Sequence, residues 1–107
     1  MIQQVTAEQL SYRLSQPGEP PVLLDVREPW EYEVCHIAES CSIPMSQLVG
    51  RLEELQPARP TVVICHHGVR SQHVAAYLER CGFANVMNLV GGVDAWARSV
   101  DPSMPTY

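Results

Sequence analysis

The stretch TVVICHHGVRS, residues 61–71, decides the fold class of this chain. Its first five residues, 61–65, are apolar or β-branched and predict a buried strand. A short loop with Gly68 at its centre follows, and apolar residues then recur at helical spacing over 71–80. A buried strand that leads through a tight loop into a helix is typical of an α/β protein with a parallel sheet.

The segments on either side continue this alternation of strands and helices. Further strands are predicted at 2–5, 22–26 and 86–89, with an extended piece at 41–43. Helices are predicted at 7–15, at 30–34, from a Ser46 N-cap through Leu48, Leu52 and Leu55, and after Gly91-Gly92 through Val93, Trp96 and Val100. This order predicts a mostly parallel sheet with helices on both faces and right-handed crossovers.

Length and composition indicate one cytoplasmic domain without nucleic-acid or membrane partners. The chain has 107 residues, and we expect a single domain over 1–107 with a core of about 5–100 and an extended tail at 101–107. The net charge is −5, and the seven basic residues are arginines scattered along the chain. The longest apolar stretch, 74–78, is far shorter than the roughly 18 residues of a membrane span, and residues 1–10 do not resemble a signal peptide. The four cysteines are expected to be free thiols.

Cys65 is the candidate nucleophile. It lies between the end of a predicted strand and the start of a predicted helix, where unpaired backbone N–H groups and the helix dipole favour an anion. The same field stabilises a thiolate, and Arg70 would help if its guanidinium turned toward the sulfur. Gly68 lets the loop curl so that several N–H groups face one point. The alternative is that Cys65 is a buried apolar residue that closes a strand, as most free cysteines are.

Five blocks of sequence, in order, resemble the rhodanese domain of the sulfurtransferase superfamily over residues 22–97. The blocks are LDVREPWEY at 24–32, HI at 36–37, IP at 43–44, CHHGVRS at 65–71, and a final block of GF at 82–83, Val86 and GGVDAW at 91–96. The resemblance implies a three-layer fold with a five-stranded, mostly parallel sheet, and a loop cysteine, here Cys65, that carries sulfur. It implies no cofactor. Two departures are Cys35, where the family usually has glycine, and His66-His67 in the loop.

The mechanism expected from the residue types has two steps. Cys65 attacks the outer sulfur of a small anionic donor such as thiosulfate, sulfite leaves, and an acceptor then takes the terminal sulfur of the persulfide. The acceptor is expected to be a thiol, cyanide or a sulfur-carrier protein, since the ending 94–107 resembles rhodanese domains that accompany sulfur-carrier-activating enzymes. The expected substrate-binding residues are His66, His67, Gly68, Val69, Arg70 and Ser71. Adjacent side chains in a tight loop generally point apart, so at most one of the two histidines is expected to reach the sulfur.

Three other residues near the predicted site are expected to be structural. Asp25 and Arg27 lie two apart on a strand, hence on one face, and buried charges are usually paired. His36 is expected to be a hydrogen-bonded structural histidine. No metal site is expected, because the cysteines and histidines show no zinc-ligand spacing. Both tryptophans and the leucine stripe at 48–55 are expected in the core.

Two alternative functions remain beside sulfur transfer. A cysteine-dependent phosphatase uses a similar thiolate and arginine, but its loop needs five residues between them to wrap a phosphate. Four residues separate Cys65 from Arg70, which favours a smaller cradle suited to a single sulfur. A non-catalytic binding or regulatory module is the third reading, and it is typical of related domains that lack the loop cysteine.

Overall fold

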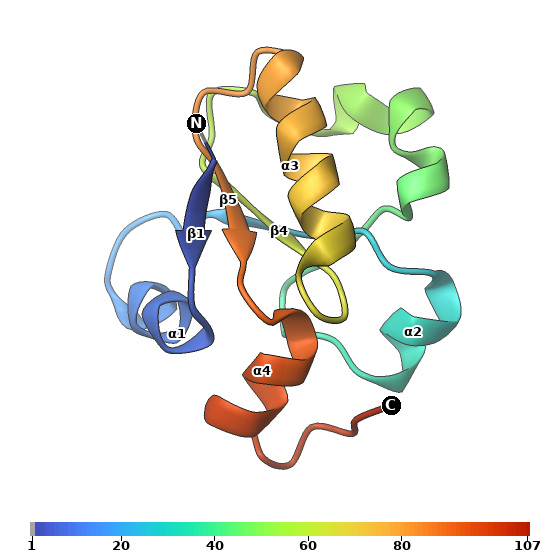
Figure 1. The fold of residues 1–107 in the computed structure, drawn as a ribbon. Coiled ribbons are helices and arrows are strands. Elements are labelled where there is room, and N and C mark those ends of the chain that lie inside the picture. The colour runs from blue at the N-terminus through green and yellow to red at the C-terminus, as the bar shows by residue number, and fades with distance from the viewer. Residues whose placement is uncertain (1) are drawn as a thin grey trace.

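A parallel sheet forms the middle layer of the protein. The computed structural model describes residues 2–107, and five strands pair in the order β1-β5-β4-β2-β3, each pairing parallel. The strands are β1 Gln3–Val5, β2 Val22–Asp25, β3 Cys41–Ser42, β4 Thr61–Ile64 and β5 Val86–Leu89. The helices are α1 Ala7–Ser15, α2 Pro29–Val34, the 3₁₀ helices η1 Met45–Gln47 and η2 Val49–Glu54, α3 Val69–Arg80, and α4 Gly92–Ser99. The predicted α/β sheet with helices on both faces is confirmed (Figure 1).

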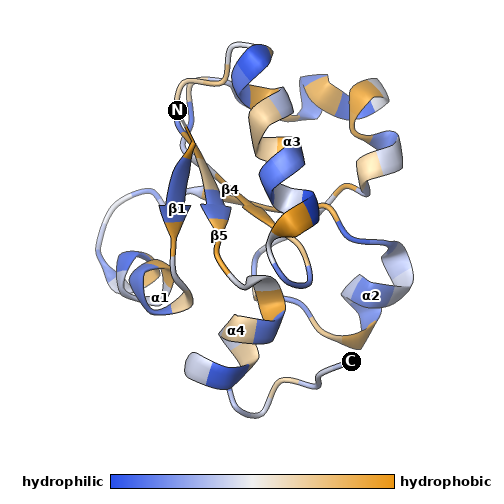
Figure 2. Cartoon of the chain, in the orientation of Figure 1, coloured by the Kyte–Doolittle hydropathy of each residue, from blue (hydrophilic) through white to orange (hydrophobic). Residues whose placement is uncertain are grey.

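Side chains that alternate along β4 build two separate hydrophobic cores. Val62 and Ile64 belong to the cluster that includes α1 and α4 residues, whereas Val63 and the following Cys65 belong to the cluster under α3. Every residue of β4 is buried because the strand lies at the centre of the sheet with helices over both faces. Figure 2 shows this hydrophobic run along β4 in the interior of the molecule. The central strand therefore delivers its carboxyl end, and Cys65 with it, to a fixed point.

The prediction of one helix from Ser46 through Leu55 was wrong, because the segment forms two 3₁₀ helices. The segment forms η1 and η2 instead, with non-helical dihedral angles at Arg51, and Pro44 rather than Ser46 occupies the N-cap position of η1. Gly50 lies in the middle of the segment and weakens an α-helix there. Leu48 and Leu55 are nevertheless buried in the cluster under α3. The apolar spacing therefore predicted which side chains are buried, although it did not predict the type of helix.

Several element boundaries also differ from the predicted ones. β4 ends at Ile64 and β2 ends at Asp25, while α3 begins at Val69 because Gly68, in a left-handed conformation, forms its N-cap. Trp30 was predicted in the core but is 58% exposed, since it lies on the outer side of α2. Trp96 is buried as predicted. Within residues 2–107, no helix has both the length and the hydropathy that crossing a membrane requires.

Candidate active site

Cys65 lies directly after β4, at the junction with α3, and is only 1% exposed. Its Sγ accepts hydrogen bonds from the backbone N–H groups of Gly68 at 3.1 Å and Ser71 at 3.3 Å. The thiol also lies 3.2 Å from the hydroxyl of Ser71. Backbone N–H groups that converge on one atom stabilise negative charge there. The loop is thus built to hold an anionic sulfur.

Two glycines allow the loop to close around the sulfur. Gly68 has a φ of +99°, and a Cβ on it would lie 3.1 Å from the backbone nitrogen of Gly91 and 3.2 Å from the carbonyl oxygen of Leu89. A side chain on Gly92 would collide with the carbonyls of Cys65 and His66. Those two carbonyls accept hydrogen bonds from the first turn of α4, from Val93 at 2.9 Å and Asp94 at 3.1 Å. The backbone N–H groups at the start of α4 therefore hold the first two residues of the loop in place.

Arg70 is paired with an acidic side chain beside the loop. Its guanidinium donates two hydrogen bonds of 2.8 Å, one to each carboxylate oxygen of Glu31 in α2. The hydrogen bonds from Arg70 lower the pKa of Glu31 from 4.5 to about 2, against the effect of burial, and the same pairing raises the pKa of Arg70. The side chain of Arg70 is still 36% exposed and interacts electrostatically with Cys65. Glu31 therefore neutralises much of the charge of Arg70 before any donor binds.

The tail forms a wall of the site, whereas the sequence predicted only an extended segment. Met104 is buried in the core, and the hydroxyl of Tyr107 donates to Glu31 Oε2 at 2.8 Å and accepts from Arg27 at 2.9 Å. The ring of Tyr107 stacks on His66 at 4.0 Å between centroids. Burial raises the pKa of Tyr107 to about 12, so its hydroxyl remains a donor at neutral pH. Figure 1 shows this end of the chain beside α2.

Asp25 and Arg27 form a buried ion pair in the place that the sequence suggested. Arg27 Nη2 lies 2.7 Å from Asp25 Oδ2 and also donates to the carbonyl of Cys35 at 2.7 Å. Burial opposes the charge of Arg27, but the hydrogen bonds that the guanidinium donates to Asp25 and Tyr107 outweigh it and raise its pKa. Through its bond to the carbonyl of Glu31 at 3.2 Å, Arg27 braces the residue that holds Arg70. The pair is placed to support the site without touching Cys65.

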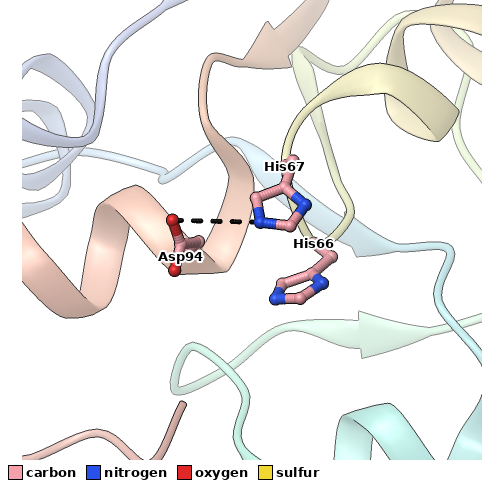
Figure 3. Close-up of side chains that lie close together, drawn as sticks. All are labelled: His66, His67 and Asp94. Atoms are coloured by element: carbon pink, nitrogen blue, oxygen red, sulfur yellow. Dashed lines mark ion pairs between the residues drawn. The ribbon is translucent and has the colours of Figure 1, made fainter. Parts of the chain in front are cut away.

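The two loop histidines lie against each other, although adjacent side chains in a tight loop generally point apart; that at most one of them reaches the sulfur stays a prediction. Their rings stack with centroids 3.9 Å apart, and His66 lies between His67 and Tyr107. Figure 3 shows both rings beside Asp94, whose carboxylate lies 4.0 Å from His67. Burial, with the nearby His67 as the second cause, lowers the pKa of His66 from its ordinary value. The ring of His66 thus contacts the tail through Tyr107.

His36 makes its contacts with Tyr32. It is exposed, and its ring stacks on Tyr32, with Nδ1 at 2.9 Å from the carbonyl oxygen of the same residue. This contact is local to α2 and the turn after it, so His36 is placed to order that turn. The four cysteines are free thiols, with Cys35 and Cys65 buried and Cys41 and Cys81 exposed.

One group of side chains has the composition of a metal site, and it includes a residue that was not considered from the sequence. His66, His67 and Asp94 each place one ligand atom within 4.8 Å of the others. A zinc ion lies about 2.0–2.1 Å from each imidazole nitrogen, along its in-plane lone pair. The two rings stack with 30° between their planes, and Asp94 is already paired with Arg98. The group is a stacked imidazole pair beside a carboxylate.

Three residues near the site were not singled out by the sequence patterns: Glu31, Asn88 and Tyr107. Glu31 is the buried acid that pairs with Arg70. The side chain of Asn88 in β5 is buried and accepts a hydrogen bond from the Ser71 hydroxyl. The burial of Glu31, and with it the need for a cation nearby, is known only from the structure. No local pattern distinguishes Asn88 or Tyr107.

Comparisons with known proteins identify the family of the chain. The family model of the rhodanese-like domain matches residues 6–99. A sulfurtransferase of Allochromatium vinosum is 37% identical over 98 residues, which cover 92% of this chain and 91% of that protein. The adenylyltransferase and sulfurtransferase MOCS3-2 of Zea mays is 36% identical over 102 residues, 89% of this chain, but the chain spans only 21% of that protein's length.

Solved structures show the same fold. A rhodanese-like domain protein from Staphylococcus aureus superposes with a TM-score of 0.85 at 27% identity, and the match covers 99% of both chains. The single-domain sulfurtransferase RDL2 of Saccharomyces cerevisiae, at 19% identity, shares the fold with a TM-score of 0.81 and covers 98% of this chain and 96% of its own. From the match over residues 6–99 and the 37% identity to a sulfurtransferase of nearly the same length, the chain belongs to the rhodanese-like domain family.

Proposed function

We propose that this protein transfers a sulfane sulfur from a small anionic donor, such as thiosulfate, to a thiophilic acceptor through a persulfide on Cys65. The observation that carries the proposal is the pair of backbone N–H groups, from Gly68 and Ser71, that converge on the Cys65 sulfur. They favour an anionic sulfur both as the attacking thiolate and as the persulfide product.

In the first step the Cys65 thiolate attacks the outer sulfur of thiosulfate. The bond between the two sulfurs of the donor breaks, its electron pair leaves with sulfite, and the outer sulfur remains on Cys65 as a persulfide. In the second step an acceptor nucleophile attacks that terminal sulfur, and Cys65 leaves as a thiolate. Arg70 gathers the donor anion at the mouth of the loop, in competition with Glu31.

For the acceptor we propose a thiol, cyanide or, in the cell, a sulfur-carrier protein. The support for a carrier comes from relatives such as MOCS3, whose names combine an adenylyltransferase with a sulfurtransferase. The Asp101–Tyr107 ending, which resembles domains that accompany carrier-activating enzymes, adds to it. Because Tyr107 and His66 stack beside the loop, a docking carrier would meet these rings as it approached the sulfur.

Mass spectrometry after incubation with thiosulfate tests the proposal. We expect the intact protein to gain one sulfur, mapped to the peptide that contains Cys65, and to lose it when cyanide or a thiol is added. Cys65→Ser should abolish the gain, while Cys41→Ser and Cys81→Ser, which remove the two exposed thiols, should retain it. A sulfur gain that persists in Cys65→Ser would overturn the proposal. Hydrolysis of an aryl phosphate that depends on Cys65 would favour the phosphatase instead.

A further inference from the structure

A buried chain of hydrogen bonds runs from Cys65 through Ser71 to Asn88. Ser71 is fully buried, and its hydroxyl lies between the Cys65 thiol, at 3.2 Å, and Asn88 Oδ1. Asn88, also buried, comes from β5, whereas Ser71 is in the first turn of α3. The direction of each hydrogen bond in this chain decides whether Ser71 supports a thiol or a thiolate.

The orientation of the Asn88 amide is fixed by its other neighbours. Its nitrogen, Nδ2, donates to the carbonyl oxygen of Gly68 at 3.3 Å and to Gln4 Oε1 at 2.9 Å. A backbone carbonyl can only accept a hydrogen bond, so the amide atom that faces Gly68 must be the nitrogen. With the amide reversed, two acceptor oxygens would face each other. Asn88 therefore presents its carbonyl oxygen to Ser71.

This orientation determines what Ser71 offers to Cys65. The Asn88 oxygen has no hydrogen to give, so the single hydrogen of the Ser71 hydroxyl must point at Asn88. The oxygen of Ser71 then has only lone pairs for Cys65. Those lone pairs accept a hydrogen bond from an S–H group, but they repel a negatively charged sulfur. Ser71 can donate to a thiolate only by rotating its hydroxyl away from Asn88.

We infer that Asn88 is a positioning residue that sets the charge state of Cys65 through Ser71. In the resting protein, Asn88 holds the Ser71 hydroxyl as an acceptor and favours the protonated thiol. When Cys65 loses its proton to water, the hydroxyl turns to donate to the thiolate, and the N–H groups of Gly68 and Ser71 remain in place. The inference rests on the proposed role of Cys65 as the sulfur-carrying nucleophile.

The ionisable groups around the loop do not depend on Asn88. They are Arg27, Glu31, His66, His67, Arg70, Asp94 and Tyr107. The Asn88 side chain is hydrogen-bonded to Ser71, Gly68 and Gln4, and none of these is ionisable. A substitution at Asn88 therefore changes the hydrogen bonding of the sulfur without altering the charges that surround it.

The test is the pH dependence of Cys65 alkylation by iodoacetamide, followed on the Cys65 peptide. Asn88→Leu removes the acceptor while keeping the branched shape of the side chain, and it frees the Ser71 hydroxyl to donate to the thiolate. We expect the midpoint of the profile to move down by about one pH unit, a tenfold change in thiolate fraction. In Ser71→Ala, the added Asn88→Leu substitution should move the midpoint no further, because the hydroxyl through which Asn88 acts is absent.

Gln4→Leu is the matched control, because it removes another hydrogen bond of Asn88 without touching Ser71, and it should leave the midpoint unchanged. If Asn88→Leu does not fold, Asn88→Ala supplies the same measurement. An unchanged or raised midpoint in a folded Asn88 variant, or an equal shift in the Ser71→Ala background, would overturn the inference. Alkylation uses no sulfur donor, so a failure to transfer sulfur would count against the proposed function and leave this result intact.

Discussion

Replacing Glu31 with glutamine should make the protein less stable at neutral pH and less sensitive to acid. The Glu31 carboxylate accepts two hydrogen bonds of 2.8 Å from Arg70 and one from Tyr107. Arg70 is the main reason that the pKa of Glu31 lies at about 2 rather than 4.5. Glutamine keeps the size of the side chain but carries no charge, so it cannot pair with the guanidinium.

The lowered pKa sets the size of the effect. The interval from 4.5 to about 2 corresponds to roughly 3 kcal/mol of stabilisation of the charged form. Water screens part of it because Arg70 is 36% exposed, so we expect Glu31→Gln to lower the free energy of unfolding by about 2 kcal/mol at pH 7. The pKa is lower in the folded state than in the unfolded state. The stabilisation is therefore complete above about pH 4.5 and is lost as the pH falls toward about 2.

Urea unfolding followed by tryptophan fluorescence at pH 7, 4 and 3 measures this difference. The gap between the native protein and Glu31→Gln should be largest at pH 7 and should narrow as the pH falls. Glu54→Gln breaks an exposed pair with Arg51 and should show no such gap. A gap of the same size at pH 7 and pH 3 would refute the electrostatic reasoning and point to lost packing. No gap at any pH would refute the pairing itself.

Three further predictions concern the walls of the site. Arg70→Ala should weaken the thiosulfate step and its salt dependence more than transfer to a neutral acceptor, measured by half-reaction kinetics; an equal loss in both steps would indicate a folding defect instead. Gly68→Ala should lower stability and sulfur transfer more than Gly18→Ala, measured by urea unfolding and turnover, because both glycines have positive φ but only Gly68 has backbone atoms at 3.1 and 3.2 Å from the new Cβ. Equal stability losses would mean that backbone strain alone is at work. Tyr107→Phe keeps the ring on His66 but loses the bonds to Arg27 and Glu31, so thermal unfolding should show a loss of about 1–2 kcal/mol, with Tyr12→Phe, an exposed tyrosine, unchanged. A loss confined to Tyr107→Ala would show that only the ring matters.

The local sequence was sufficient to predict the sheet and the place of the candidate nucleophile. The mostly apolar runs at β2, β4 and β5 reflect strands buried on both faces, and a run of this kind can be recognised from local residue types. Helical spacing and the Thr6–Gln9 capping box predicted α1, because both are interactions over three or four residues. Cys65 followed from the same reasoning, since a strand end and a helix start adjoin it in sequence.

The partners of the site residues depended on the tertiary structure. Arg70 meets Glu31 across 39 residues of sequence, and Tyr107 meets Glu31 across 76, so no local pattern encodes either contact. The stacking of His66 was missed for the same reason, because the tail supplies the second face of its ring. The sequence indicated which groups carry charge and where the backbone could hold an anion. Only the packing of α2, the tail and β5 around one loop decided which of those charges and hydroxyls are already paired, because pairing requires groups to meet in space.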